Sequence, residues 1–175
     1  MSRELWQGSG NRQSSLLPLI SHRKGIPVST TSTRLFIGFA AGFLSHLIFQ
    51  GALGTALYAA HLLPSLPWSL APVPPLGVPQ TISLGFWAGL WGIAYAWFEP
   101  RLTARFGQLL GGAIYAFAPL LGHWFVAQPL KGRGIGGGFN PAVIPIELAF
   151  TVAFGIGLAV ILWLGLGLTR RQSPA

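Results

Sequence analysis

Three long intervals of this sequence contain no Asp, Glu, Lys or Arg, and they constrain its fold more than any other feature. The intervals lie between Arg34 and Glu99, between Arg105 and Lys131, and between Glu147 and Arg170. Charged residues make up 8% of the chain, against roughly 25% in a typical soluble domain. Because so few ionic groups cannot cover a water-exposed surface, we interpret the intervals as membrane-crossing segments.

These intervals contain four predicted spans, so the sequence predicts an all-α integral membrane four-helix bundle. The approximate bounds of the spans are 35–63, 81–98, 106–126 and 145–168. Pro64 and Pro67 are expected to end the first span, because proline removes an amide donor. Glu99-Pro100 is expected to end the second, and Pro119 to kink the third. Each span reaches the roughly 17–25 residues that a bilayer core requires.

The segments outside the spans are polar or rich in proline. Residues 1–33 have little apolar content, so we predict a disordered cytoplasmic tail ahead of a transmembrane domain at 34–169. Residues 170–175 are predicted to form a second cytoplasmic tail. Residues 64–80 contain six prolines, which favour extended backbone packed on the outer helix ends. Trp68, within this segment, is expected among the lipid headgroups.

Basic residues predict the orientation of the spans. Placing the N-terminus in the cytoplasm puts nine basic residues inside and two outside. The inner residues are Arg3, Arg12, Arg23, Lys24, Arg34, Arg101, Arg105, Arg170 and Arg171, and the outer ones are Lys131 and Arg133. The positive-inside rule therefore predicts that both termini are cytoplasmic. This signal explains the net charge of +8, so nucleic acid is not an expected partner.

Three of the predicted spans each contain a pair of glycines four residues apart. The pairs are Gly38/Gly42, Gly85/Gly89 and Gly107/Gly111. Small residues at this spacing let helix backbones approach closely in lipid. We therefore expect tight packing between the helices, and association with a second copy or with another membrane protein.

Polar side chains interrupt the first span. Ser45, His46 and Gln50 lie near its middle, and His61 follows at its outer end on the same broad stripe. In hydrocarbon such groups need partners, so the stripe is expected to face the bundle interior. Two interpretations stay open: hydrogen bonds that join the helices, or the lining of a path for a small solute.

The predicted outer end of the bundle brings further polar residues together. His61 and His123 belong to this face on separate spans, and two such histidines can ligate a haem iron axially. Lys131, Arg133 and Glu147 form a predicted outer-face cluster, in which Glu147 either neutralises a basic residue or joins the histidines. The loop KGRGIGGG has the composition of an anion-binding nest or of a flexible connection. Beyond the haem alternative, the sequence predicts no cofactor and no metal site.

The sequence lacks the residue sets that enzymes use. It contains no aspartate and no cysteine, so a Ser-His-Asp triad, thiolate chemistry and disulfides are excluded. Glu99 and Glu147 are predicted at opposite membrane faces, so no paired carboxylates support acid–base catalysis. We therefore predict a non-enzymatic structural or interaction subunit. A transporter or channel subunit with a path past His46 and Gln50, and a haem protein, are the alternatives.

Several stretches resemble a family of small four-span bacterial membrane proteins without an assigned activity. They are FQGALG at 49–54, APVPPLGVPQ at 71–80, SLGFWAGLWGIAYA at 83–96 and QPLKG at 128–132. Family members often have Phe-His-Gln in the first span, where this chain has Ile48-Phe49-Gln50. The resemblance implies a bacterial inner-membrane location and a four-helix fold, and it implies no chemistry.

Overall fold

The structure, a computed structural model, describes residues 31–171 and is mostly helical. Its helical elements are α1 (Thr31–Ser45), η1 (His46–Gln50), α2 (Gly51–Ala59), α3 (Gln80–Phe106), α4 (Gln108–Tyr115), α5 (Phe117–Gly122), η2 (His123–Ala127), α6 (Gln128–Leu130), η3 (Ile135–Gly138) and α7 (Ile144–Arg171). The strands β1 (Pro72–Val73) and β2 (Val78–Pro79) pair antiparallel. The all-α prediction fits this structure. Of the tails predicted at 1–33 and 170–175, residues 1–30 and 172–175 lie outside the described residues.

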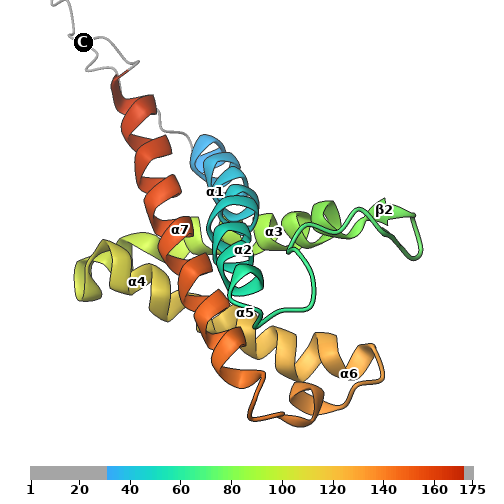
Figure 1. Cartoon of the computed structure of the whole chain (residues 1–175). Coiled ribbons are helices and arrows are strands. Elements are labelled where there is room, and N and C mark those ends of the chain that lie inside the picture. The colour runs from blue at the N-terminus through green and yellow to red at the C-terminus, as the bar shows by residue number, and fades with distance from the viewer. Residues whose placement is uncertain (1–30, 172–175) are drawn as a thin grey trace, which may run out of the picture.

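Three helices among the described residues are long and apolar enough to cross a membrane. They are Thr31–Ala59, Gln108–Leu130 and Ile144–Thr169. Figure 1 shows that the first joins α1 to α2 and the second joins α4 to α6, each as a nearly continuous run of helix. A membrane protein is therefore supported by three apolar helices, and a fourth span through α3 stays a prediction.

The first long helix is shifted toward the N-terminus relative to its prediction. It runs from Thr31 to Ala59, whereas the sequence predicts 35–63. Residues 31–33 therefore belong to a helix and not to the predicted tail. At the other end of the fold, α7 continues to Arg171, beyond the predicted bound at 168.

A local backbone motif ends the first helix before Pro64 is reached. The N–H of Leu62 donates to the carbonyl of Leu57 at 2.9 Å. The N–H of His61 donates to the carbonyl of Tyr58 at 2.9 Å. This is the Schellman arrangement, and His61 takes the left-handed conformation (φ 60°) that glycine usually supplies.

The second predicted span, 81–98, is longer in the structure. The sequence predicts a turn over residues 99–105, but α3 continues through them to Phe106. The helix ends where Gly107 takes φ 78°, a conformation that suits glycine. The start of the third helix, predicted at 106, thereby moves to Gln108.

α3 survives Pro100 because another helix replaces the lost hydrogen bond. Pro100 has no amide proton to donate to the carbonyl of Ala96, four residues earlier. Arg34 Nε of α1 donates to that carbonyl at 2.7 Å. In the third helix, by contrast, Pro119 deprives Tyr115 of its partner, and α4 ends at Tyr115 as the predicted kink requires.

The long helices pack so that each contacts two others. α1 packs against α3 and α7, and α4 packs against the same two helices. In Figure 1, α3 passes behind α1 and α7 and connects the β-hairpin at one end with α4 at the other. Residues far apart in the chain are therefore brought together where these helices cross.

Glycines allow two of these contacts to be made backbone to backbone. Where α1 meets α3, a Cβ on Gly92 would lie 2.1 Å from the carbonyl oxygen of Gly38. Where α4 meets α7, a Cβ on Gly112 would lie 2.4 Å from the carbonyl oxygen of Gly155. The close packing that the pairs Gly38/Gly42 and Gly85/Gly89 predict is therefore confirmed between α1 and α3. The pair Gly107/Gly111 does not form such a crossing, because Gly107 lies between two helices and a Cβ there would meet nothing within 4 Å.

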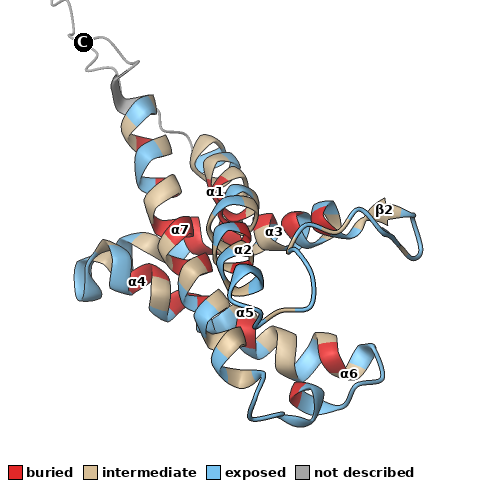
Figure 2. Ribbon diagram, in the orientation of Figure 1, coloured by how far each residue is buried: buried red, intermediate tan, exposed pale blue. Residues whose placement is uncertain are grey.

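Burial is confined to the inner surfaces of the helices. Figure 2 shows buried residues where α1, α3 and α7 approach one another, and Tyr95, Leu158 and Leu162 are fully enclosed there. Large apolar side chains remain outside, including Phe36 at 74% and Trp163 at 62% exposure. Large apolar side chains on the outer surface of the helices are what contact with lipid favours.

Candidate functional site

The first long helix contains a π-helical turn, η1, at its middle. A π-turn is wider than an α-turn, displaces backbone hydrogen bonds and is frequent at functional sites. This one begins at His46 and ends at Gln50, two members of the predicted polar stripe. A second π-turn, η2, begins at His123. Hydropathy does not reveal either turn, because a single extra residue barely changes the pattern of apolar positions.

The proline-rich segment folds back along the first helix. The indole of Trp68 covers Gly51, where an added Cβ would lie 2.6 Å from the ring. Its Nε1 donates to the carbonyl of Leu47 within η1 at 3.3 Å. The carbonyl of Ser69 accepts from the amide and the hydroxyl of Thr81, at 3.1 and 2.9 Å, at the start of α3. Trp68 therefore lies at the level of the middle turn, and not at the helix end where it was predicted.

A cleft of about 310 Å³ opens between η1, the folded-back segment and the start of α3. Its polar lining consists of His46, Gln50, Ser65, Ser69 and Gln80. No charged side chain of the described residues lines it. Most of the remaining wall is apolar and includes Leu63, Leu66, Leu84 and Phe150. An apolar cleft of this size with a few polar groups suits a small uncharged molecule.

Two hydrogen bonds determine the tautomer of neutral His46. Gln50 Nε2 donates to the carbonyl of Phe150 at 3.1 Å, and because a carbonyl only accepts, the amide nitrogen must face it. Gln50 Oε1 then faces His46 Nδ1 at 2.7 Å and requires a proton from it. Nε2 therefore keeps a free lone pair. It has no protein partner in the described part of the chain and is not sealed off by protein atoms.

This tautomer is directly measurable. In ¹⁵N NMR spectra of histidine-labelled protein near pH 8, we expect His46 to show a protonated Nδ1 and an unprotonated Nε2. Gln50→Leu removes the acceptor, so the ring should shift toward the Nε2-protonated form. A wild-type His46 protonated on Nε2 would show that the Gln50 hydrogen bond does not select the tautomer.

The other members of the polar stripe have separate positions. Ser45 is fully buried and donates to the carbonyl of Phe154 at 2.7 Å, so it joins α1 to α7. His61 is exposed beyond the helix end, where its backbone completes the helix cap. The structure therefore brings Ser45, His46 and Gln50 against α7 and leaves His61 outside this group.

At the far end of the third helix, Glu147 approaches a histidine and not a basic residue. Its Oε1 lies 3.8 Å from His123 Nε2, and its Oε2 accepts from Trp124 Nε1 at 2.6 Å. Lys131 and Arg133 are exposed, and neither forms an ion pair with Glu147 within residues 31–171. Of the two predicted roles of Glu147, the structure therefore shows the approach to histidine.

The two histidines of the haem hypothesis make no contact with each other. No hydrogen bond or ion pair joins His61 to His123 in the described part of the chain. No group of three or more His, Cys, Asp or Glu side chains gathers there either. Haem binding stays a prediction without a supporting contact.

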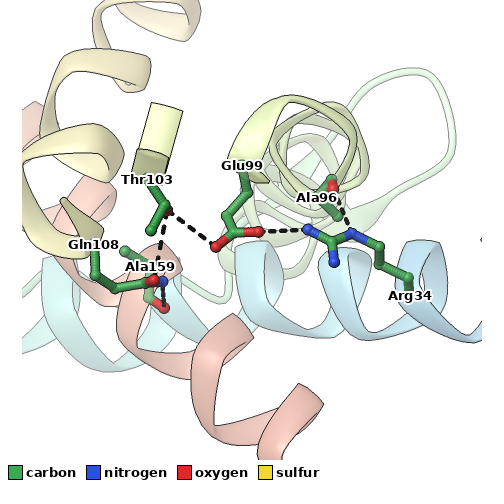
Figure 3. A network of polar contacts seen from close by, with 6 residues as sticks. All are labelled: Arg34, Ala96, Glu99, Thr103, Gln108 and Ala159. Atoms are coloured by element: carbon green, nitrogen blue, oxygen red, sulfur yellow. Dashed lines mark hydrogen bonds and ion pairs between the residues drawn. The ribbon is translucent and has the colours of Figure 1, made fainter. Parts of the chain in front are cut away.

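A polar network at the other end of the helices was missed by sequence reasoning. In Figure 3, the guanidinium of Arg34 is paired with Glu99, whose Oε1 accepts from Thr103 Oγ1 at 3.0 Å. The Thr103 hydroxyl also lies 3.5 Å from Gln108 Oε1. Gln108 Nε2 donates to the carbonyl of Ala159 at 3.0 Å. The network joins α1, α3, α4 and α7. The signal available in the sequence was an acidic residue directly before a proline.

No family model, characterised protein or solved structure matches this chain. The resemblance to small four-span bacterial membrane proteins therefore stays a prediction.

Proposed function

We propose that this chain is a bacterial inner-membrane protein that binds a small uncharged polar solute beside His46 and serves as a transporter or channel subunit. Two observations carry the proposal: the cleft that His46 lines contains no charged side chain, and neutral His46 keeps a lone pair on Nε2 that no protein group of the described residues occupies. A neutral imidazole accepts a hydrogen bond from a hydroxyl or amide without the free-energy penalty of a buried charge. We assign no reaction to the chain.

The proposal includes four spans with both termini in the cytoplasm. The uncharged part of α3, residues 80–98, is about 28 Å long, which is close to the thickness of a bilayer core of about 30 Å. Its glycines contact α1, the first of the apolar helices. Nine basic residues lie on the predicted cytoplasmic face and two on the outer face, and this excess supports the proposed orientation.

Solute flux tests this function in proteoliposomes. We expect liposomes with the purified protein to take up glycerol or urea faster than empty liposomes, as followed by stopped-flow light scattering. His46→Leu removes the acceptor and replaces it with an apolar side chain, so we expect the added flux to fall at least tenfold. Expression and the thermal midpoint of the variant should stay close to wild type.

His61→Asn is the matched control, because asparagine keeps the left-handed helix cap and the residue lies outside the cleft. It should leave the flux unchanged. Wild-type liposomes that match empty ones, or a His46→Leu variant with full flux, would reject solute passage at this cleft. A more stable His46→Leu protein with nothing lost would assign the polar stripe to packing alone.

The prediction of a structural or interaction subunit receives less support. That prediction rests on the absence of catalytic residue sets and on glycine-rich helix faces that a partner could occupy. The glycines at 38, 42, 85 and 89 all contact other helices of this chain. These four positions are therefore not free for a partner, and we rank solute binding first.

A further inference from the structure

We propose that His123, Gln128 and Glu147 form a binding site for a divalent transition-metal ion of the Zn²⁺ type. The site lies where η2 approaches the start of α7, away from the cleft at His46, and the proposal does not depend on the proposed function. Two observations support it: a gap between two facing acceptors, and a buried amide oxygen without a partner.

The gap lies between His123 and Glu147. With the amide nitrogen of Gln128 facing the ring at 3.1 Å, His123 Nε2 accepts that hydrogen bond. Glu147 Oε1 stands 3.8 Å from the same Nε2 and is also an acceptor. Two acceptor atoms that face each other repel, and a cation bound between them replaces this repulsion by attraction. Two ligands of a tetrahedral Zn²⁺ ion, each bonded at about 2.0–2.2 Å, lie about 3.4 Å apart, so the two side chains must approach each other by roughly 0.4 Å to bind the ion.

The unpartnered atom belongs to Gln128. The residue is 7% exposed, and its Oε1 is buried without a hydrogen-bond partner in the described part of the chain. A half-turn of the amide about its last torsion exchanges Oε1 with the nitrogen that now faces His123. This movement would turn Gln128 Oε1 toward the gap between His123 and Glu147, where it could serve as the third metal ligand. Water would complete the coordination from the exposed side of His123.

Trp124 orients the carboxylate. Its Nε1 donates to Glu147 Oε2 at 2.6 Å, which leaves Oε1 directed at His123. Hydrogen bonds of this kind to ligating carboxylates are typical of metal sites and raise their affinity.

The donor set selects the type of metal. An imidazole nitrogen with a carboxylate and an amide oxygen favours Zn²⁺, Co²⁺ or Ni²⁺ over Mg²⁺ and Ca²⁺, which prefer all-oxygen sites. Lys131 and Arg133 follow on the exposed loop, and water screens much of their repulsion toward a cation. We therefore expect moderate affinity, with ready exchange.

Metal binding by the purified full-length chain, without an affinity tag, tests the proposal. The parent protein for these measurements has the substitutions His22→Asn and His61→Asn, so that His46 and His123 are its remaining histidines. Isothermal titration with Zn²⁺ should show one ion per chain, and Co²⁺ should produce visible d–d absorption bands. His123→Ala and Glu147→Gln should each weaken binding at least tenfold, and Trp124→Phe should weaken it to a smaller extent.

Glu147→Gln preserves shape and serves if His123→Ala fails to fold. His46→Leu in the same background is the control, and it should bind Zn²⁺ like the parent. The proposal is overturned if the parent takes up no Zn²⁺. It is equally overturned if Glu147→Gln leaves the affinity unchanged, or if His46→Leu loses binding to the same extent.

Discussion

Gly92→Ala is expected to destabilise the folded protein by about 3 kcal/mol, the upper end of the usual range for overpacking a core. The new Cβ would lie 2.1 Å from the carbonyl oxygen of Gly38 and 2.9 Å from the Cα of Gly42. All of these are backbone atoms of a helix, so no side-chain rotation relieves the clash. α1 and α3 must separate, and the contacts around the crossing weaken together. Unfolding by SDS in mixed micelles, followed by far-UV circular dichroism, measures the loss.

Gly167→Ala is the matched control for this prediction. Gly167 lies on α7, and a Cβ there meets nothing within 4 Å. We expect unchanged or slightly raised stability, because alanine favours helix by up to about 1 kcal/mol over glycine. Equal losses in both variants would mean that glycine matters for α-helix flexibility and not for the crossing.

Glu99→Ala should cost about 2–3 kcal/mol, because it leaves the guanidinium of Arg34 without its carboxylate. The side chains of Arg34 and Glu99 are 24% and 13% exposed, so the loss falls below that of a fully buried pair. The variant also removes the acceptor of Thr103. Arg101→Gln, on the exposed side of the same helix, should change stability by less than about 0.5 kcal/mol.

Pro100→Ala separates the two roles of Arg34. Alanine returns an amide proton that can donate to the Ala96 carbonyl, which Arg34 Nε now occupies. Arg34→Met should therefore be milder in the Pro100→Ala background than in the wild type, by about 1 kcal/mol, the worth of one hydrogen bond. A double-mutant cycle on SDS unfolding measures this coupling. Strictly additive effects would show that Arg34 does not replace the bond that Pro100 removes.

The candidate site was only partly visible in the sequence. Ser45, His46 and Gln50 are conspicuous as polar residues within an apolar segment, although the π-helical turn η1 that His46 and Gln50 bound is not visible there. The partners of these residues were not visible, because Phe154 and Phe150 offer backbone carbonyls that every residue carries. The return of Trp68 to Leu47 was hidden for the same reason.

The sequence by itself determined that long apolar helices would form, and roughly where they lie. Hydropathy and chain length are properties of consecutive residues, so no folding information is needed to interpret them. The sequence also indicated that glycine-spaced helices would pack closely. These predictions agree with the three apolar helices and with the contacts of Gly38 and Gly42 with α3, whereas the crossing of Gly112 with Gly155 lies outside the predicted pairs.

Only the tertiary structure decided where helices continue, which polar groups meet and which ring nitrogen of neutral His46 carries the proton. α3 passes Pro100 because Arg34, 62 residues before Ala96 in the chain, supplies the donor that the Ala96 carbonyl lacks. Glu147 contacts His123 and Trp124, although the basic residues Lys131 and Arg133 are nearer to Glu147 in the chain. The physical reason is common to these cases: a hydrogen bond depends on distance and direction in space, and local sequence encodes only the capacity to form one.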